Sequence, residues 1–130
     1  MSGPPHRFPD AALLATGYLR PLLPGVHVGT AVPRPRLPEM VLLRRIGGTQ
    51  RNAGVDDARI DIQVWAPTDD RATELAEDTR AHLAAIGQHR PEVRQVDTST
   101  GPTLIPDAPA DVPRALMTIT LSVRGVAVPA

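Results

Sequence analysis

The sequence contains no cysteine, no lysine and only three aromatic residues. Without cysteine there are no disulfides, thiolate metal sites or cysteine nucleophiles. No apolar stretch approaches the roughly 18 residues that a membrane-spanning helix needs. Residues 1–10 also lack the basic and apolar regions of a secretory signal. We therefore expect a cytoplasmic protein that makes no membrane contact.

The charges balance, because fourteen basic residues face fourteen acidic ones and the formal net charge is zero. A general electrostatic grip on nucleic acid needs a basic excess, which this composition does not supply. Zero net charge also removes the self-repulsion that keeps small proteins apart. The composition therefore favours self-association over nucleic-acid binding.

The length of 130 residues is typical of one domain, and we expect a single domain over residues 1–130. Ten glycines and fifteen prolines predict long connections between its elements. We expect flexible ends at residues 1–8 and 126–130.

Hydrophobic periodicity predicts two helices and five strands. The helices are expected at residues 10–20 and from Thr68, as N-cap, to a stop at Gly87. The strands are expected at residues 26–30, 40–46, 58–66, 93–97 and 117–124, with an extended link at 31–38, a mobile hairpin loop at 47–57 and a loop at 99–113. This order predicts an α+β fold: a mainly antiparallel or mixed sheet of four to five strands with two helices packed on one face.

Catalytic motifs are mostly missing from the sequence. It has no nucleophile elbow, no phosphate-binding glycine loop and no pair of histidines at metal-ligand spacing. A metal-dependent enzyme using Asp56, Asp57 and Asp61 is the alternative hypothesis. Adjacent residues of an extended chain rarely converge on one ion, so we favour a structural or binding protein without enzyme activity, cofactor or metal.

Arginines are concentrated in one part of the chain, where a single acid, Glu39, accompanies them. They are Arg34, Arg36, Arg44, Arg45 and Arg51. One interpretation is a contact patch for an acidic partner or for DNA phosphates. The other is ordinary solvated charge, and the sequence leaves both open.

Trp65 is the large aromatic residue in the middle of the chain. On an extended strand it lies opposite Ile60, Ile62 and Val64, which places it on the face away from the helices. An outward tryptophan is a candidate interface anchor. The alternative is that it covers a sheet edge or a loop of its own subunit.

Several motifs together resemble one family. The most specific is DDARIDIQVWA at residues 56–66; the others are the opening helix at 9–20, RRIGG at 44–48, GPTLIPD at 101–107 and the last strand at 114–125. The layout resembles the tail terminator, or tail completion, proteins of long-tailed phages that infect high-GC actinobacteria.

This resemblance implies a structural virion protein, assembled in the host cytoplasm. Such subunits form a hexameric ring that caps the head-proximal end of the tail tube, ends tube polymerisation and docks to the head-completion connector. DNA would pass through the lumen without sequence-specific binding, and neither enzyme activity nor a cofactor is implied. Another neck or adaptor protein of the virion is the alternative within the same class.

The residue roles are hypotheses. For contacts with neighbouring subunits or the tube, the candidates are Trp65, Arg44, Arg45, Gly47, Gly48, Arg51, Asn52 and Asp57. For a connector or partner loop, they are Arg34, Arg36, Pro102 and Asp107. We expect Trp65→Ala to leave a folded protein that fails to assemble.

Overall fold

The computed structural model describes residues 4–129 of the chain. Five strands form one sheet in the order β2-β3-β4-β6-β5. Their bounds are β2 (His27–Gly29), β3 (Met40–Asn52), β4 (Val55–Trp65), β5 (Val93–Leu104) and β6 (Arg114–Arg124). β2 runs parallel to β3, and every other neighbouring pair is antiparallel. The sheet is therefore mixed and mainly antiparallel, as the sequence predicts.

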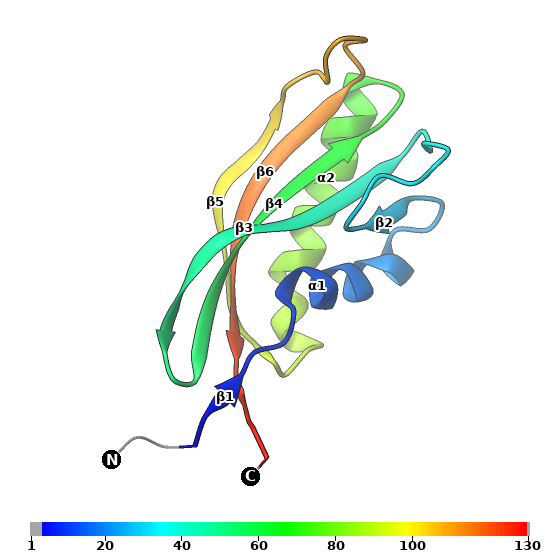
Figure 1. The fold of residues 1–130 in the computed structure, drawn as a ribbon. Coiled ribbons are helices and arrows are strands. Elements are labelled where there is room, and N and C mark those ends of the chain that lie inside the picture. Colours follow the sequence, from blue (N-terminus) through cyan, green and yellow to red (C-terminus); the bar gives the residue numbers. More distant parts are fainter. Residues whose placement is uncertain (1–3, 130) are drawn as a thin grey trace.

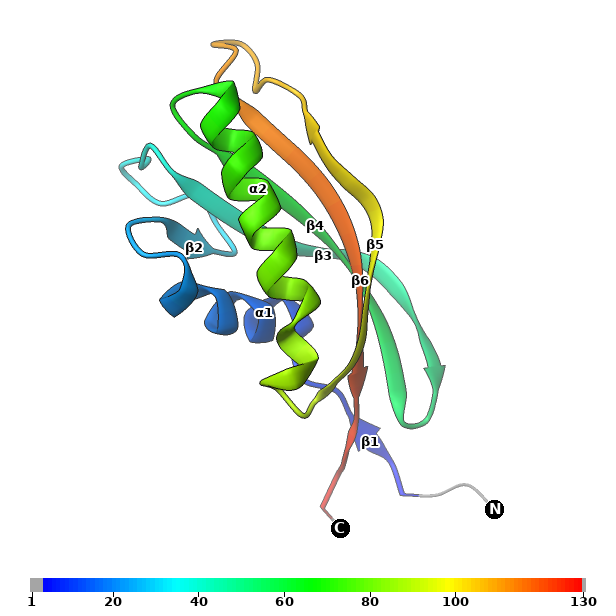
Figure 2. The same cartoon turned by 180° about the vertical axis from the view of Figure 1, so that it is seen from behind.

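Two helices cover one face of this sheet (Figures 1 and 2). α1 (Ala11–Leu19) continues into the short 3₁₀ helix η1 (Arg20–Leu22), and α2 (Asp69–Ala84) is followed by η2 (Ile86–Gln88). The Asp10 side chain caps α1 by accepting a hydrogen bond from the Leu13 amide, and Thr68 caps α2 in the same way through the Arg71 amide. The predicted helices, the Thr68 cap and the α+β class are confirmed.

The core lies between the helices and the sheet. Alternate residues of β4 and β6 point into it, as the period of two along a strand requires. These core residues are Ala58, Ile60, Ile62 and Val64 from β4, and Ala115, Met117, Ile119, Leu121 and Val123 from β6. The odd-numbered side chains of β4 point to the opposite face, which we call the open face.

The predicted mobile loop at residues 47–57 is wrong. β3 continues to Asn52 and β4 begins at Val55, so the two strands form one long hairpin with a turn at residues 53 and 54. Gly47 and Gly48 have φ angles of 145° and 118°, which let β3 pass through a bulge and resume pairing. The glycines therefore bend the strand where the sequence pattern indicated that it ended.

The predicted loop at residues 99–113 is too long, because β5 extends to Leu104. β5 is an edge strand that pairs, among the described residues, only with β6, and an edge tolerates the proline at position 102. The remaining loop is closed by mutual main-chain hydrogen bonds between Asp107 and Val112.

Two short strands lie within the chain ends that the sequence predicts to be flexible, and the flexibility itself stays a prediction. β1 (His6–Arg7) pairs with β7 (Val126–Ala127) in a second, two-stranded sheet. This small sheet lies at the end of the molecule nearest the termini (Figure 1). Residues 1–3 and 130 of the predicted ends lie outside the described residues.

Candidate interaction surfaces

Trp65 lies on the open face, as predicted, but its expected exposure is wrong because the residue is only 4% exposed. It packs with Met40 and Leu42 in a small cluster separate from the main core. Its indole Nε1 donates a hydrogen bond of 2.9 Å to Asp107 Oδ2. Of the two sequence interpretations, the geometry supports the one in which Trp65 covers a loop of its own subunit.

Two arginines complete the surroundings of Trp65. The Arg36 guanidinium lies 5.4 Å from the ring centroid and 3.8 Å from Asp107 Oδ2. Arg114 Nη1 lies 3.3 Å from Asp107 Oδ1, and its Nε donates to the Ile105 carbonyl oxygen. These contacts hold two distant segments, residues 31–38 and 105–113, against the sheet. The side chains that make them are Trp65, Arg36, Asp107 and Arg114. We call these two segments the loop end of the molecule.

The loop end exposes several large apolar side chains. Half of the large hydrophobic residues that are exposed in the structure lie on it or directly before it. They are Val32, Leu37, Leu104, Ile105 and Val112. A shallow cavity of about 370 Å³ separates the two segments, with Arg36 and Leu37 on one wall and Asp111 and Val112 on the other. Arg34 is exposed beside it, and this preformed surface suits contact with another protein.

The remaining predicted site residues gather on the β3–β4 hairpin. Arg45 makes a bidentate ion pair with Asp56, at 2.6 and 3.0 Å. Arg51 makes a bidentate ion pair with Asp57, with both contacts at 2.9 Å, and Ser122 Oγ donates a hydrogen bond to the same carboxylate. The hairpin is therefore stiffened by its own ion pairs rather than mobile.

These contacts shift the ionisation of the paired groups. Hydrogen bonds from Ser122 and Arg51 lower the pKa of Asp57 below its ordinary value. The hydrogen bond to Asp56 raises the pKa of Arg45. Both shifts stabilise the charged forms, as expected for groups that hold the hairpin together.

The three carboxylates of the enzyme hypothesis do not form one site. Asp56 points to the helix face and is 5% exposed, whereas Asp57 and Asp61 point to the open face. Successive strand residues alternate between faces, so the adjacent pair is separated by the sheet itself. Within residues 4–129 no three His, Cys, Asp or Glu side chains come close enough to hold a metal ion.

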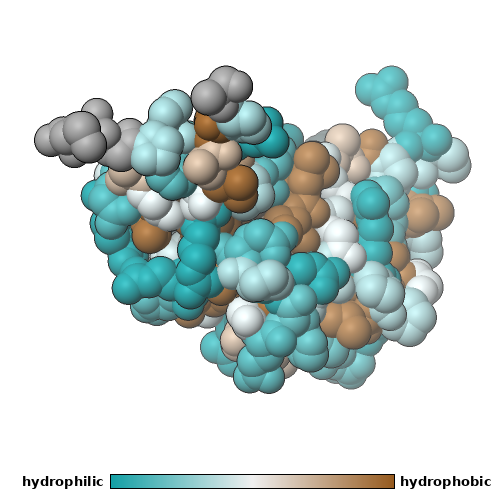
Figure 3. Space-filling model, turned by 90° about the horizontal axis from the view of Figure 1, so that it is seen from below, coloured by the Kyte–Doolittle hydropathy of each residue, from teal (hydrophilic) through white to brown (hydrophobic). Residues whose placement is uncertain are grey.

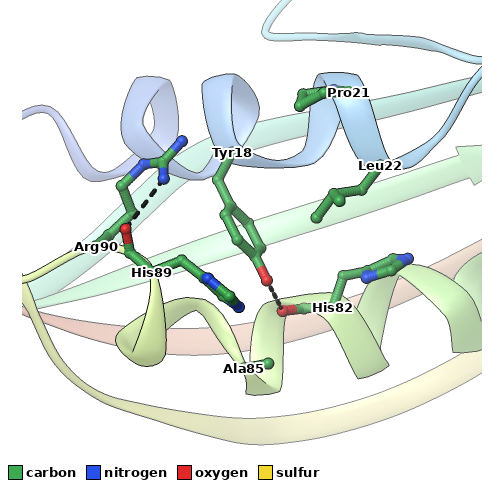
Figure 4. A pocket seen from close by; sticks show the side chains of 7 residues that line it. All are labelled: Tyr18, Pro21, Leu22, His82, Ala85, His89 and Arg90. Atoms are coloured by element: carbon green, nitrogen blue, oxygen red, sulfur yellow. Dashed lines mark hydrogen bonds between the residues drawn. The ribbon is translucent and has the colours of Figure 1, made fainter.

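Another hollow lies between the C-terminal parts of α1 and α2 (Figure 4). It has a volume of about 300 Å³, and Tyr18 forms its centre. Tyr18 donates a hydrogen bond to the His82 carbonyl oxygen, while His89 and Arg90 stack on its ring. The described lining residues include no carboxylate, and nothing in their arrangement provides a nucleophile with a base.

An ion pair that the sequence analysis does not predict joins α2 to the segment before β3. Arg71 on α2 holds Glu39, just before β3, through bonds of 2.7 and 3.0 Å. The hydrogen bond lowers the pKa of Glu39 and raises that of Arg71. The two residues are 32 positions apart, so no local pattern could have revealed the pair.

The opposite end of the molecule, seen in Figure 3, is largely hydrophilic, and apolar residues appear there as separate patches. Beyond Leu43, every residue of β3 is exposed. Ile46, at the bulge, is 51% exposed, and Arg44, Gly47, Gly48 and Asn52 also lie on this exposed stretch.

No helix in the described part of the chain is long and apolar enough to span a membrane.

The chain matches the family model of phage tail termination proteins over residues 7–128. No curated protein gives a significant match. The family match begins within β1 and ends just past β7, and so includes the whole five-stranded sheet, both helices and the loop end.

Proposed function

Because the chain belongs to the family of phage tail termination proteins, we propose that its copies form a closed ring on the head-proximal end of the tail tube. The chain is a structural component of the phage tail, and the match over residues 7–128 carries this conclusion. Our proposal goes further in three respects: the ring is a hexamer, it stops the growth of the tail tube, and it docks to the head-completion connector.

The surface of the subunit supports an assembly of copies. The zero net charge places no barrier to association. The loop end offers a rigid apolar surface, and the exposed part of β3 offers a second contact region away from it. A contact between two different regions is heterologous, and it closes into a ring when the rotation between copies is right.

The two faces of the sheet suit different sides of such a ring. The helices thicken one face, so we place them on the outside, where the circumference is larger. The open face would then line the lumen. It carries the hydroxyl groups of Thr49, Thr118 and Thr120 among mixed charges such as Asp57 and Arg59. A neutral polar lining lets DNA pass without a sequence-specific grip.

The loop end is the proposed docking surface for the next ring of the tail or neck. It contains the predicted partner residues Arg34, Arg36 and Asp107, and Pro102 lies close by on β5. The Trp65 and Asp107 hydrogen bond fixes its shape before a partner arrives. Preorganisation of this kind reduces the entropy cost of docking.

The test is assembly of the tail tube protein of the same phage, followed by electron microscopy with and without the purified chain. The proposal expects ring-shaped density on one end of each tube and shorter tubes as the chain is added. Unchanged tube lengths with bare tube ends would contradict it. Density on isolated connectors but not on tubes would support the neck or adaptor alternative.

A further inference from the structure

The five-stranded sheet has two long edges without a partner strand in residues 4–129. β2 pairs with β3 only at residues 40–42, so the rest of β3 leaves one edge unpaired. We call residues 43–52 the β3 free edge. β5 pairs with β6 alone, and we call residues 93–104 the β5 outer edge. Unpaired edges present rows of main-chain donors and acceptors that can bind another strand.

The two edges run in opposite directions. β3 is antiparallel to β4, β4 to β6, and β6 to β5. If neighbouring copies are related by a rotation about an axis along the strands, the β3 free edge of one copy meets the β5 outer edge of the next in antiparallel orientation. Antiparallel pairing is the slightly more stable arrangement per residue. The rotation between copies keeps every helix layer on the same side of the ring.

The regular parts of the two edges lie at the same height in the sheet. In β3 the register is regular at residues 47–50, between two bulges, and in β5 it is regular at residues 95–98. Thr49 pairs with Asp57, which pairs with Ser122, which pairs with Gln95. Residues 47–49 of the β3 free edge and residues 95–97 of the β5 outer edge therefore lie at the same height in the sheet.

Side chains at this height are compatible with a close approach. Gly47 and Gly48 leave room beside the β3 free edge for another backbone. Arg44 lies on the open face near them, and Asp97 lies on the same face of β5. Neither makes an ion pair among the described residues, and Asp97 accepts a hydrogen bond from the Gln95 side chain, so the two carry complementary charges without an ionic partner.

We infer that ring neighbours are joined by antiparallel main-chain pairing between the β3 free edge and the β5 outer edge, with Arg44 and Asp97 forming an ion pair across the contact. The occupant of each edge is thus a second copy of this chain. The inference rests on the proposed ring and specifies how that ring closes. It also predicts that a β3 edge does not meet a β3 edge, because that pairing would leave Arg44 without the carboxylate that Asp97 supplies.

The absence of cysteine allows a direct cross-linking test, since any disulfide must come from the introduced residues. Thr49→Cys is combined in turn with Gln95→Cys, Asp97→Cys or Thr100→Cys. These β5 positions share one face, so the series includes the staggers that closure of a sheet requires. At least one double variant is expected to give a ladder of disulfide-linked multimers on a non-reducing gel.

Matched controls separate this contact from others. Each single-cysteine variant should remain unlinked, because a heterologous contact never brings the same position of two copies together. A Thr49→Cys, Ala81→Cys variant places its second thiol on the exposed face of α2 and should also remain unlinked. The reduced variants should unfold at the wild-type urea midpoint.

Charge reversal provides an independent readout. Arg44→Asp and Asp97→Arg should each weaken assembly, measured by light scattering, and the double variant should recover it. If wild type assembles but no double-cysteine variant cross-links, the ring remains and edge pairing is wrong. Dimers from a single-cysteine variant would show like-edge pairing and would also overturn the inference. A wild-type monomer at every concentration with no cross-linking would overturn both the ring and the pairing.

Discussion

The indole of Trp65 and the carboxylate of Asp107, 42 residues apart in sequence, are joined by a hydrogen bond of 2.9 Å. This bond ties the loop that follows β5 to the last residue of β4. The loop end therefore has a defined shape in the isolated subunit. Its apolar residues are displayed on a rigid support rather than on a flexible segment.

Substitution of Trp65 separates packing from hydrogen bonding. Trp65→Ala should lower the free energy of unfolding by about 3–5 kcal/mol, as for other buried aromatic residues. Trp65→Phe should lower the free energy of unfolding by about 1 kcal/mol because the hydrogen bond is lost. A further loss comes from the part of the indole packing that phenylalanine does not replace. Urea denaturation followed by circular dichroism measures both changes.

The sequence predicts that Trp65→Ala leaves a folded protein that fails to assemble. The burial of the side chain adds a loss of stability to that prediction. Wild-type stability for Trp65→Ala would show that the indole contributes little to its own subunit, and would restore Trp65 as an interface anchor.

The sequence predicts correctly those features that depend on neighbouring residues, such as helix caps and strand alternation. The Thr68 cap and the alternation of Ile60, Ile62 and Val64 follow from capping and strand periodicity, and the structure has both. The sequence places a loop at residues 47–57 because glycines among polar side chains are typical of turns, whereas in the structure Gly47 and Gly48 form a bulge within β3. The free edges depend on strand order, which no short-range pattern encodes.

The ion pair of Arg45 and Asp56 offers a second test. Arg45→Ala should cost about 1–3 kcal/mol, because it leaves the buried Asp56 carboxylate without its partner. The Arg45→Ala, Asp56→Ala double variant should cost less than the two single changes together. Thermal unfolding of the wild type, the two single variants and the double variant completes this double-mutant cycle.

Arg44→Ala is the matched control for that cycle. Arg44 is exposed, lies on the opposite face of β3, and should change the stability of the monomer by less than about 0.5 kcal/mol. If Arg44→Ala and Arg45→Ala lowered the free energy of unfolding equally, the ion pair with the buried Asp56 carboxylate would not explain the effect of Arg45.

Gly48 should be intolerant of a side chain. It has a φ of 118°, and an added Cβ would clash with the main-chain carbonyl oxygen of Asp57. Gly48→Ala should therefore cost at least about 1–3 kcal/mol in the free energy of unfolding. Gly101→Ala, where a Cβ meets nothing within 4 Å, should be near neutral. A neutral Gly48→Ala would show that the bulge relaxes without strain.

Stability should fall in acid because of Glu39 and Asp57. Their ion pairs and hydrogen bonds lower both pKa values in the folded state relative to the unfolded state. The resulting stabilisation is complete above the ordinary carboxyl pKa of about 4 and is lost as the pH falls through the lowered folded-state values. Urea midpoints measured from pH 7 down to pH 2 should show this loss.

Glu39→Gln identifies the contribution of one group to that acid profile. The variant should be less stable than wild type at neutral pH, and the difference should shrink at the lowest pH, where Glu39 is protonated in both states of the wild type. A constant difference between the two proteins across the range would exclude Glu39 as a source of the pH dependence.

The central claim is that copies of this chain close into a ring. Light scattering behind a sizing column, over a series of protein concentrations, tests it most directly. The account predicts a species near six times the 13.9 kDa subunit mass that grows no further as concentration rises. A mass that increases continuously with concentration, or a monomer throughout the series, would contradict it.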